Sequence, residues 1–80
     1  MTHTILRLPA IKTSTGLSRS TIYLRIAQGF FTKPVSLGGR AVGWPSNEVL
    51  ALNAARIAGK TDTEVRDLVV KLEAARKTVA

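Results

Sequence analysis

The sequence predicts a mainly α-helical domain that carries one small β-hairpin. Its 80 residues suffice for one small domain. Two short helical segments are joined by a turn of four residues, and an alternating apolar stretch around two glycines follows them. Two further segments with helix-capping residues complete the chain. With 45% apolar and 21% charged residues, the composition is typical of a foldable globular protein.

The first helix is short and is marked at both ends. Residues 1–8 are expected to form an extended lead-in. Pro9 suits the first position of a helix because its missing N–H would have no partner there, and the helix continues over residues 10–15. Gly16 then ends the helix, since glycine readily adopts the left-handed conformation found after a helix C-terminus.

A second helix is predicted over residues 19–28. Ser18 is a favourable N-cap because its hydroxyl can accept a hydrogen bond from a free N–H of the first turn. Ile22 and Ile26 lie one turn apart and, with Leu17 from the turn, form the side expected to be buried. Two short helices joined by a glycine-containing turn are the pattern of a helix-turn-helix.

A β-hairpin follows the second helix. Pro34 marks its start, Val35 and Leu37 alternate with a polar residue, and residues 41–44 return after the turn. Residues 38–39 are both glycine and can adopt positive φ at the apex. In DNA-binding proteins such a hairpin is called a wing. The predicted architecture is therefore a winged helix-turn-helix with an extra C-terminal helix.

A third helix is predicted over residues 47–58, with Ser46 as its N-cap and Gly59 at its end. Glu48 lies in the first turn, where the helix dipole favours an acidic side chain. The apolar set of this helix is Val49, Leu50, Ala54 and Ile57.

The fourth helix is predicted over residues 62–78 and starts with a capping box of Thr61 and Glu64. Its apolar residues follow a spacing of 3, 4, 3 and 4, with Val69 beside them: Val65, Leu68, Leu72, Ala75 and Val79. Such a stripe is too apolar to stay in water. We therefore expect the helix to cap the core, to mediate self-association or to bind a foreign partner.

The whole chain has a net charge of +7, and most of this positive charge lies in its first half. Residues 48–80 contain six basic and five acidic side chains, whereas residues 1–47 contain no acid. The basic residues of that first part are Arg7, Lys12, Arg19, Arg25, Lys33 and Arg40. Such a surface favours a polyanionic partner, although solubility alone is an alternative explanation.

The second helix contains the residues predicted to read DNA. They are Ser18, Arg19, Ser20, Thr21, Tyr23, Leu24 and Arg25. Arg19, in the first turn, is the best candidate for a bidentate contact with guanine. The hydroxyl groups suit phosphates or bases. Leu24 suits a thymine methyl group or is an ordinary half-exposed apolar residue, and Tyr23 is alternatively a packing residue.

Lys12, Lys33 and Arg40 are predicted to contact the DNA backbone. Lys12 lies on the first helix, Lys33 precedes the hairpin, and Arg40 lies beside the hairpin tip. A wing tip normally lies near the backbone or the minor groove, where arginine is favoured. For Arg40 the alternative is a structural contact, either an ion pair with Glu48 or a hydrogen bond to a helix-end carbonyl. Trp44 is expected in the core rather than on a base-stacking surface.

The sequence contains no recognisable catalytic or metal-binding constellation. It has no Cys and a single histidine, His3, and the acids of the fourth helix are expected to be solvated. We therefore expect no enzymatic activity and no cofactor. The N-terminus lacks the apolar core of a signal peptide, and no apolar run approaches the roughly 18 residues of a membrane span. Together with the absence of Cys, this favours a cytoplasmic protein.

Several short motifs occur in a consistent order: Ile5–Pro9, Thr15–Tyr23, Gly29, Pro34-Val35, Leu37-Gly38, Arg40–Trp44 and Glu48-Val49. Over residues 5–52 the chain resembles the AlpA family of phage- and prophage-derived transcriptional regulators, which are related to MerR-type winged helices and to excisionases. The resemblance implies a winged helix-turn-helix, DNA binding and hence association with the bacterial nucleoid. It also implies a role in activating mobile-element genes or in directing integrase towards excision. Where the family often has Arg after the tyrosine, this chain has Leu24.

These observations predict a sequence-specific, double-stranded DNA-binding protein of a bacterial mobile element that regulates integrase or other element genes. An excisionase that bends attachment-site DNA and recruits integrase is an alternative with the same fold. A protein-interaction adaptor is the alternative from another class. Residues 1–59 would form the DNA-binding unit, and residues 60–80 its C-terminal helix. Expected partners are DNA, a second copy of the chain through residues 62–79 and a phage-type integrase.

Overall fold

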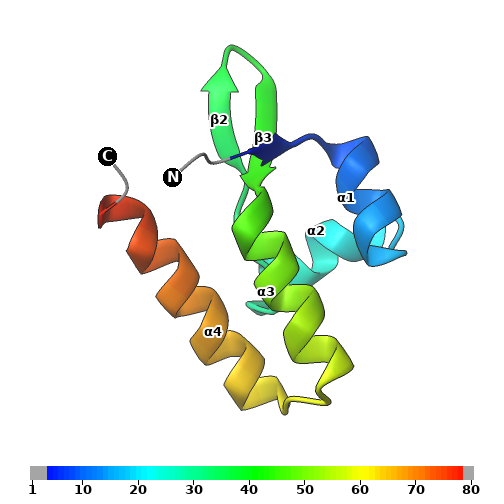
Figure 1. Ribbon diagram of the computed structural model, residues 1–80. Coiled ribbons are helices and arrows are strands. Elements are labelled where there is room, and N and C mark those ends of the chain that lie inside the picture. The colour runs from blue at the N-terminus through cyan, green and yellow to red at the C-terminus, as the bar shows by residue number, and fades with distance from the viewer. Residues whose placement is uncertain (1–3, 79–80) are drawn as a thin grey trace.

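The computed structural model describes residues 4–78. Within this range, four α-helices pack below a small three-stranded sheet (Figure 1). In chain order the elements are β1 (Ile5–Leu6), α1 (Leu8–Thr15), α2 (Arg19–Gln28), β2 (Val35–Gly38), β3 (Ala41–Pro45), α3 (Ser46–Ile57), α4 (Asp62–Ala75) and a 3-10 helix, η1 (Arg76–Thr78). The predicted mainly helical fold with one hairpin is confirmed. None of the helices in the described range is long and apolar enough to span a membrane.

The three strands form an antiparallel sheet in the order β1-β3-β2. Strand β1 pairs with the end of β3, so that Leu6 lies opposite Trp44. Gly43 allows this close approach, because a Cβ atom there would clash with the side chain of Ile5 and lie 3.0 Å from the Leu6 carbonyl oxygen. The expected lead-in is therefore part of the sheet, a pairing that the sequence alone does not reveal.

The β2-β3 hairpin contains a bulge close to its tip. Ser36 lies opposite Val42, but Gly38 lies opposite Ala41, so Leu37 is the extra residue on β2. Residues 39 and 40 form the turn itself. Arg40 is thus at the apex of the wing rather than beside a Gly-Gly apex.

The turn between α1 and α2 has the predicted chemistry. Gly16 adopts φ 72°, and its N–H donates to the Lys12 carbonyl at 2.9 Å. The Ser18 hydroxyl accepts a hydrogen bond from the Thr21 N–H at 3.3 Å and so caps α2. Helix α1 begins earlier than predicted, at Leu8. These local contacts fix the path of the chain from α1 into α2.

The predicted N-cap of α3 is wrong. Strand β3 runs directly into the helix, so Pro45 occupies the N-cap position and Ser46 is the first helical residue. Pro45 provides no side-chain hydrogen bond. The N–H of Ser46 instead donates to the Thr4 carbonyl at 2.7 Å, which ties the start of α3 to the segment that leads into β1.

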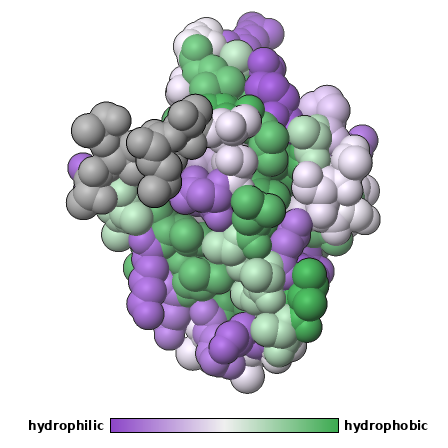
Figure 2. All heavy atoms as spheres, viewed as in Figure 1, coloured by the Kyte–Doolittle hydropathy of each residue, from purple (hydrophilic) through white to green (hydrophobic). Residues whose placement is uncertain are grey.

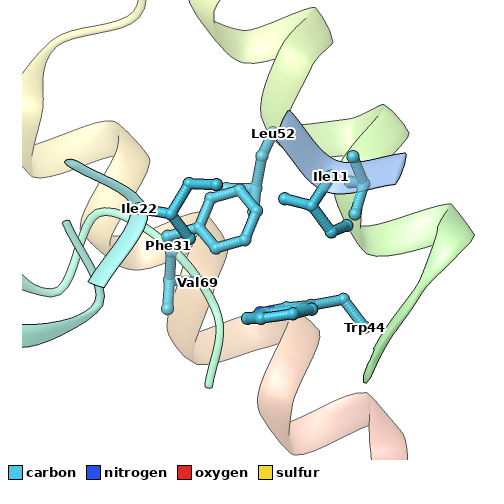
Figure 3. Close-up of a cluster of buried hydrophobic side chains, with 7 residues drawn as sticks. Ile11, Ile22, Phe31, Trp44, Leu52 and Val69 are labelled. Carbon is cyan, nitrogen blue, oxygen red and sulfur yellow. The ribbon is translucent and has the colours of Figure 1, made fainter. Parts of the chain in front are cut away.

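The core draws on every helix and on β3. Its buried members are Ile11, Ile22, Phe31, Trp44, Val49, Leu52 and Val69. Figure 3 shows the flat Trp44 indole below a group of side chains that come from the four helices and from the segment after α2. Trp44 is fully buried, as predicted, and its Nε1 donates to the Thr32 carbonyl at 2.9 Å.

The buried side of α3 differs from its predicted apolar set. Leu50 and Ile57 are 68% and 88% exposed, and Ala54 is exposed as well. The buried residues are Glu48, Val49, Leu52 and Ala55. Spacings of three and four occur on two sides of this helix, so periodicity alone did not identify the side that faces the core. Hydrophobic surface consequently runs along α3 in Figure 2.

Helix α4 packs on the protein's own core. Val69 is buried, and three members of the predicted stripe are partly buried against the same cluster: Val65, Leu68 and Leu72. Val79 lies outside the described residues. The predicted capping box is present, and hydrogen bonds from the Thr61 backbone and hydroxyl lower the pKa of Glu64. Of the alternatives for this helix, the structure shows the core-capping arrangement.

Candidate nucleic-acid interface

The outward side of α2 carries most of the residues predicted to read DNA. Arg19 and Ser20 are exposed, and Tyr23 and Leu24 are 37% and 56% exposed. Ile22, on the inward side, is fully buried. Ten helical residues span about 15 Å, and a helix of this size enters a major groove roughly 12 Å wide. The helix therefore presents an exposed surface of cationic, hydroxyl and apolar side chains on the side away from Ile22.

Three hydroxyl groups gather at the N-terminus of α2. The Ser18 Oγ lies 2.9 Å from the Thr21 Oγ1 and 3.3 Å from the Ser20 Oγ. The first-turn N–H groups and the helix dipole favour an anion at such an end. Ser18 also caps the helix, so its hydroxyl holds the helix start in place while it lies beside the other two. This geometry suits contact with a phosphate.

Arg19, Tyr23 and Trp44 are in sequential contact from the surface into the core. The Arg19 guanidinium carbon lies 5.8 Å from the centroid of the Tyr23 ring, at the outer limit of a cation–π contact. The Tyr23 ring meets Trp44 edge to face, with centroids 6.4 Å apart. The position of Arg19 is thus connected to a fully buried indole through one intervening ring.

Arg25 lies away from this outward side. It lines a pocket together with Phe30 and with residues of the α3–α4 connection, and its Nε is buried without a hydrogen-bond partner in the described structure. Charged residues also line this pocket, namely Arg56, Lys60 and Asp62. This placement separates Arg25 from the exposed set that begins with Arg19.

The three predicted backbone contacts are all exposed. Lys12 lies on α1, Lys33 precedes β2, and Arg40 is in the wing turn. The alternative ion pair between Arg40 and Glu48 is wrong, because Arg76 donates to both Glu48 carboxylate oxygens, at 2.6 and 2.8 Å. The Arg40 side chain is therefore exposed at the tip of the hairpin and is not paired with Glu48.

The acidic residues lie on α3 and α4, outside the helix-turn-helix and the hairpin, although Glu73 accepts a hydrogen bond from the Lys33 N–H. Helices α1 and α2 and strands β2 and β3 contain no Asp or Glu, and Glu48 is buried in α3. The other four acids belong to α4: Asp62, Glu64, Asp67 and Glu73. In Figure 1, α3 lies between α1 and α4, so the acidic helix and the start of the helix-turn-helix are on different sides of the molecule. Within residues 4–78, no group of three or more histidine and acidic side chains is arranged to hold a metal ion.

Three residues of the C-terminal part contact α2 or the segment that follows it, and these contacts were not predicted from the sequence. Arg66 reaches the end of α2, whereas Glu73 and Arg76 reach the backbone of Lys33. Their partners lie 38 to 43 residues away along the chain. No local pattern signals such contacts.

A helix-turn-helix followed by a hairpin and a third helix is the arrangement of a winged helix-turn-helix, as the sequence predicted. Comparison with known proteins extends this result. Residues 4–52 match the model of a protein family described as Prophage CP4-57 regulatory protein (AlpA). The chain belongs to the AlpA family, a family of prophage regulatory proteins, and the resemblance inferred from its motifs is confirmed.

One relative comes from a bacteriophage. The chain is 53% identical over 55 residues to the uncharacterized protein ORF88 of Enterobacteria phage P4. The alignment covers 69% of this chain and 62% of the phage protein, less than two thirds of that relative's length. No solved structure matches the chain significantly. Helix α4 begins after residue 52, so it lies beyond the family match.

Proposed function

We propose that this protein binds double-stranded DNA in a sequence-specific manner and regulates transcription of the integrase or other genes of a mobile element. Membership of the AlpA family supports the regulatory role. DNA binding rests on one observation: α2 exposes Arg19, Ser20, Tyr23 and Leu24 from a part of the chain that has six basic residues and no acid. Such a regulator acts in the bacterial cytoplasm, where its DNA lies.

In this proposal α2 enters the major groove with its N-terminal turn foremost. Arg19 donates two hydrogen bonds to O6 and N7 of a guanine, and Ser20 and Tyr23 contact bases or phosphates through their hydroxyls. Leu24 contacts a thymine methyl group. Arg25 is left out of the reading set because its side chain faces the α3–α4 connection.

Backbone contacts fix the orientation of the protein on DNA. The N-terminal end of α2, with Ser18 and Thr21, binds a phosphate, and Lys12 on α1 binds a neighbouring one. Lys33 and Arg40 carry the positive charge of the hairpin towards the DNA backbone or the minor groove. These contacts carry no sequence information themselves, but they hold α2 at one position along the groove.

The salt dependence of binding tests the proposal. Fluorescence anisotropy measures binding to DNA of the element that encodes the protein. The slope of log affinity against log salt should be about −4 to −5, because about four to six phosphates are neutralised. Lys71→Ala, a change on an exposed position of α4, should leave this slope unchanged. A slope near zero would contradict DNA binding and would favour a protein-interaction adaptor.

Footprinting distinguishes the regulator from an excisionase. The DNA tested should include the promoters and the attachment site of the element. Protection of a promoter, with altered transcription of the adjacent gene, is the expected result. Protection confined to repeated sites beside the attachment core, together with DNA bending, would instead assign the role of an excisionase.

A further inference from the structure

Side chains from the C-terminal part of the chain hold the segment that joins α2 to β2. The Arg66 Nε donates to the Gln28 carbonyl at 3.2 Å, at the end of α2. The Glu73 carboxylate accepts a hydrogen bond from the Lys33 N–H at 2.8 Å. Arg76, in η1, donates to the Lys33 carbonyl at 2.7 Å. Both ends of this connecting segment are thus bound from the C-terminal part.

Arg66 makes two kinds of contact at the end of α2. Besides its hydrogen bond to Gln28, its guanidinium carbon lies 4.6 Å from the centroid of the Phe30 ring. A cation at a helix C-terminus interacts favourably with the helix dipole, and a guanidinium near an aromatic face gains a cation–π attraction. The last turn of α2 and the first aromatic residue after it are therefore held by one α4 side chain.

Arg76 joins the connecting segment to α3. The same guanidinium that binds the Lys33 carbonyl forms a bidentate pair with Glu48, which is 2% exposed. These hydrogen bonds to Glu48 raise the pKa of Arg76 above its ordinary value. A planar guanidinium bound on both sides has little rotational freedom. Arg76 thus holds the segment that precedes the wing against Glu48, a buried residue of α3.

The polar contacts flank an apolar one on the same side of α4. Arg66 and Glu73 are two helical turns apart, and Val69 lies between them along the helix and packs into the core cluster that contains Phe31. The segment is therefore held by apolar packing at its centre and by hydrogen bonds at its ends. An apolar contact alone would permit sliding, whereas hydrogen bonds to Lys33 and Gln28 set a register.

We propose that α4 and η1 set the angle between α2 and the wing, with Arg66, Glu73 and Arg76 as positioning residues for DNA recognition. This inference rests on the proposed function, since it concerns how two DNA-contacting elements are held together. All three residues lie beyond residues 4–52, so the match to the family model does not include them. Each of the three forms a hydrogen bond with the protein backbone, at Gln28 or Lys33.

The physical reason is preorganisation. The segment between α2 and β2 has no regular secondary structure within residues 29–34. If it were loosely held, binding would have to order it so that α2 and the hairpin meet the same DNA duplex together. Specific binding needs both elements in register, whereas non-specific binding depends mainly on net charge. Loss of a positioning contact should therefore weaken specific binding more than non-specific binding.

The distance between α2 and the wing gives a direct test. The chain has no native cysteine, so spin labels at Ala27→Cys on α2 and Ser36→Cys on β2 report this distance without interference. We expect a narrow distance distribution for the parent, and a broader or shifted one when Glu73→Ala is added. Asp67→Ala, which removes the same charge from an exposed position of α4, is the matched control and should leave the distribution unchanged.

Rescue by a conservative change separates positioning from charge. Glu73→Gln keeps an oxygen that can accept the Lys33 N–H, so it should restore the narrow distribution that Glu73→Ala loses. Thermal melting is recorded for each variant. A Glu73→Ala protein that melts close to wild type yet shows a broadened distribution supports the proposal. An unchanged distribution in that variant overturns it.

DNA affinity provides the second readout. Compared with Asp67→Ala, Glu73→Ala should lose roughly three- to tenfold in the ratio of specific to non-specific affinity, the effect of about one hydrogen bond. Arg66→Ala should lose a similar factor relative to Lys71→Ala, which removes the same charge. Equal ratios in each matched pair would overturn the positioning role. If wild type binds no DNA at all, the proposed function fails, but the distance measurement still shows whether the three residues fix the angle.

Discussion

The Tyr23 ring meets the Trp44 indole edge to face, with ring planes inclined by 67°. Tyr23 is partly exposed on the outward side of α2, whereas Trp44 is fully buried and also contacts Phe31 edge to face, with centroids 6.3 Å apart. The candidate DNA-reading side is thus in direct contact with the centre of the core. A side chain that must face a groove in one orientation benefits from such a rigid neighbour.

Replacement of Trp44 should therefore affect the whole domain. Trp44→Ala is expected to destabilise the protein by about 3–5 kcal/mol, because it removes a large buried aromatic side chain and the hydrogen bond to the Thr32 carbonyl. Urea unfolding followed by circular dichroism measures the change. Tyr23→Phe is the control: it keeps the ring contact and should stay within about 0.5 kcal/mol of wild type. A Trp44→Ala protein as stable as that control would show that the indole is not the centre of the core.

Arg19 and Lys33 should respond differently to the sequence of the DNA. Arg19→Ala is expected to cost roughly 1–3 kcal/mol on the preferred site and to relax the preference at one base position. Lys33→Ala should weaken binding to all sequences about equally, because the side chain is exposed and its backbone contacts with Glu73 and Arg76 remain. Selection of bound sequences from a randomised pool measures both effects. If neither variant changes the selected sequence, α2 does not read the bases.

Arg40 should contribute to binding and not to folding. It is exposed in the wing turn, and Glu48, its alternative partner, is bound by Arg76. Arg40→Ala is therefore expected to lower DNA affinity while the melting temperature stays close to that of wild type. Fluorescence anisotropy measures the DNA affinity of this variant, and thermal unfolding measures its melting temperature. An unaltered affinity would remove the hairpin tip from the interface, and a large drop in melting temperature would point to a structural contact of Arg40.

The parts of the fold that follow from local signals could be predicted from the sequence. Gly16 and Ser18 mark the helix-turn-helix because helix ends depend on residues within one turn of the chain. The hairpin and the capping box of Thr61 and Glu64 are equally local. Trp44 could be placed in the core because a small domain with few aromatic residues buries its largest one.

The contacts that could not be predicted join residues far apart in the sequence. Strand β1 can pair with β3 because Gly43 leaves room for Ile5. The residues around Ile5 and Gly43 contain no local signal that predicts this pairing. Arg76 forms an ion pair with Glu48, which lies 28 residues earlier in the chain. The inward orientation of α3 also depends on neighbours, namely on where α1 and α4 pack. For the candidate interface, the exposed side of α2 followed from helical periodicity, but the placement of Arg25 depended on the α3–α4 connection.

The role of α4 in stability can be measured at two adjacent residues. Val69 is 5% exposed and packs in the core, whereas the next residue, Val70, is 66% exposed. Val69→Ala should destabilise the protein by roughly 1–3 kcal/mol through lost apolar burial and an unfilled cavity. Val70→Ala removes the same atoms from the surface and should change stability by less than about 0.5 kcal/mol.

Urea unfolding of wild type and the same two variants, at low and at high protein concentration, tests self-association through residues 62–79. The side chains that motivated that expectation, among them Leu68 and Leu72, pack on the core, so an assembly through them would require α4 to leave its own domain. We therefore expect the Val69→Ala protein to lose unfolding free energy to the same extent at low and high protein concentration. A concentration-dependent stability in wild type that Val69→Ala abolishes would show instead that the apolar side of α4 is shared between two copies. Deletion after Gly59 is a poorer test, because it would remove Val69 from the core together with the contacts of Arg66, Glu73 and Arg76.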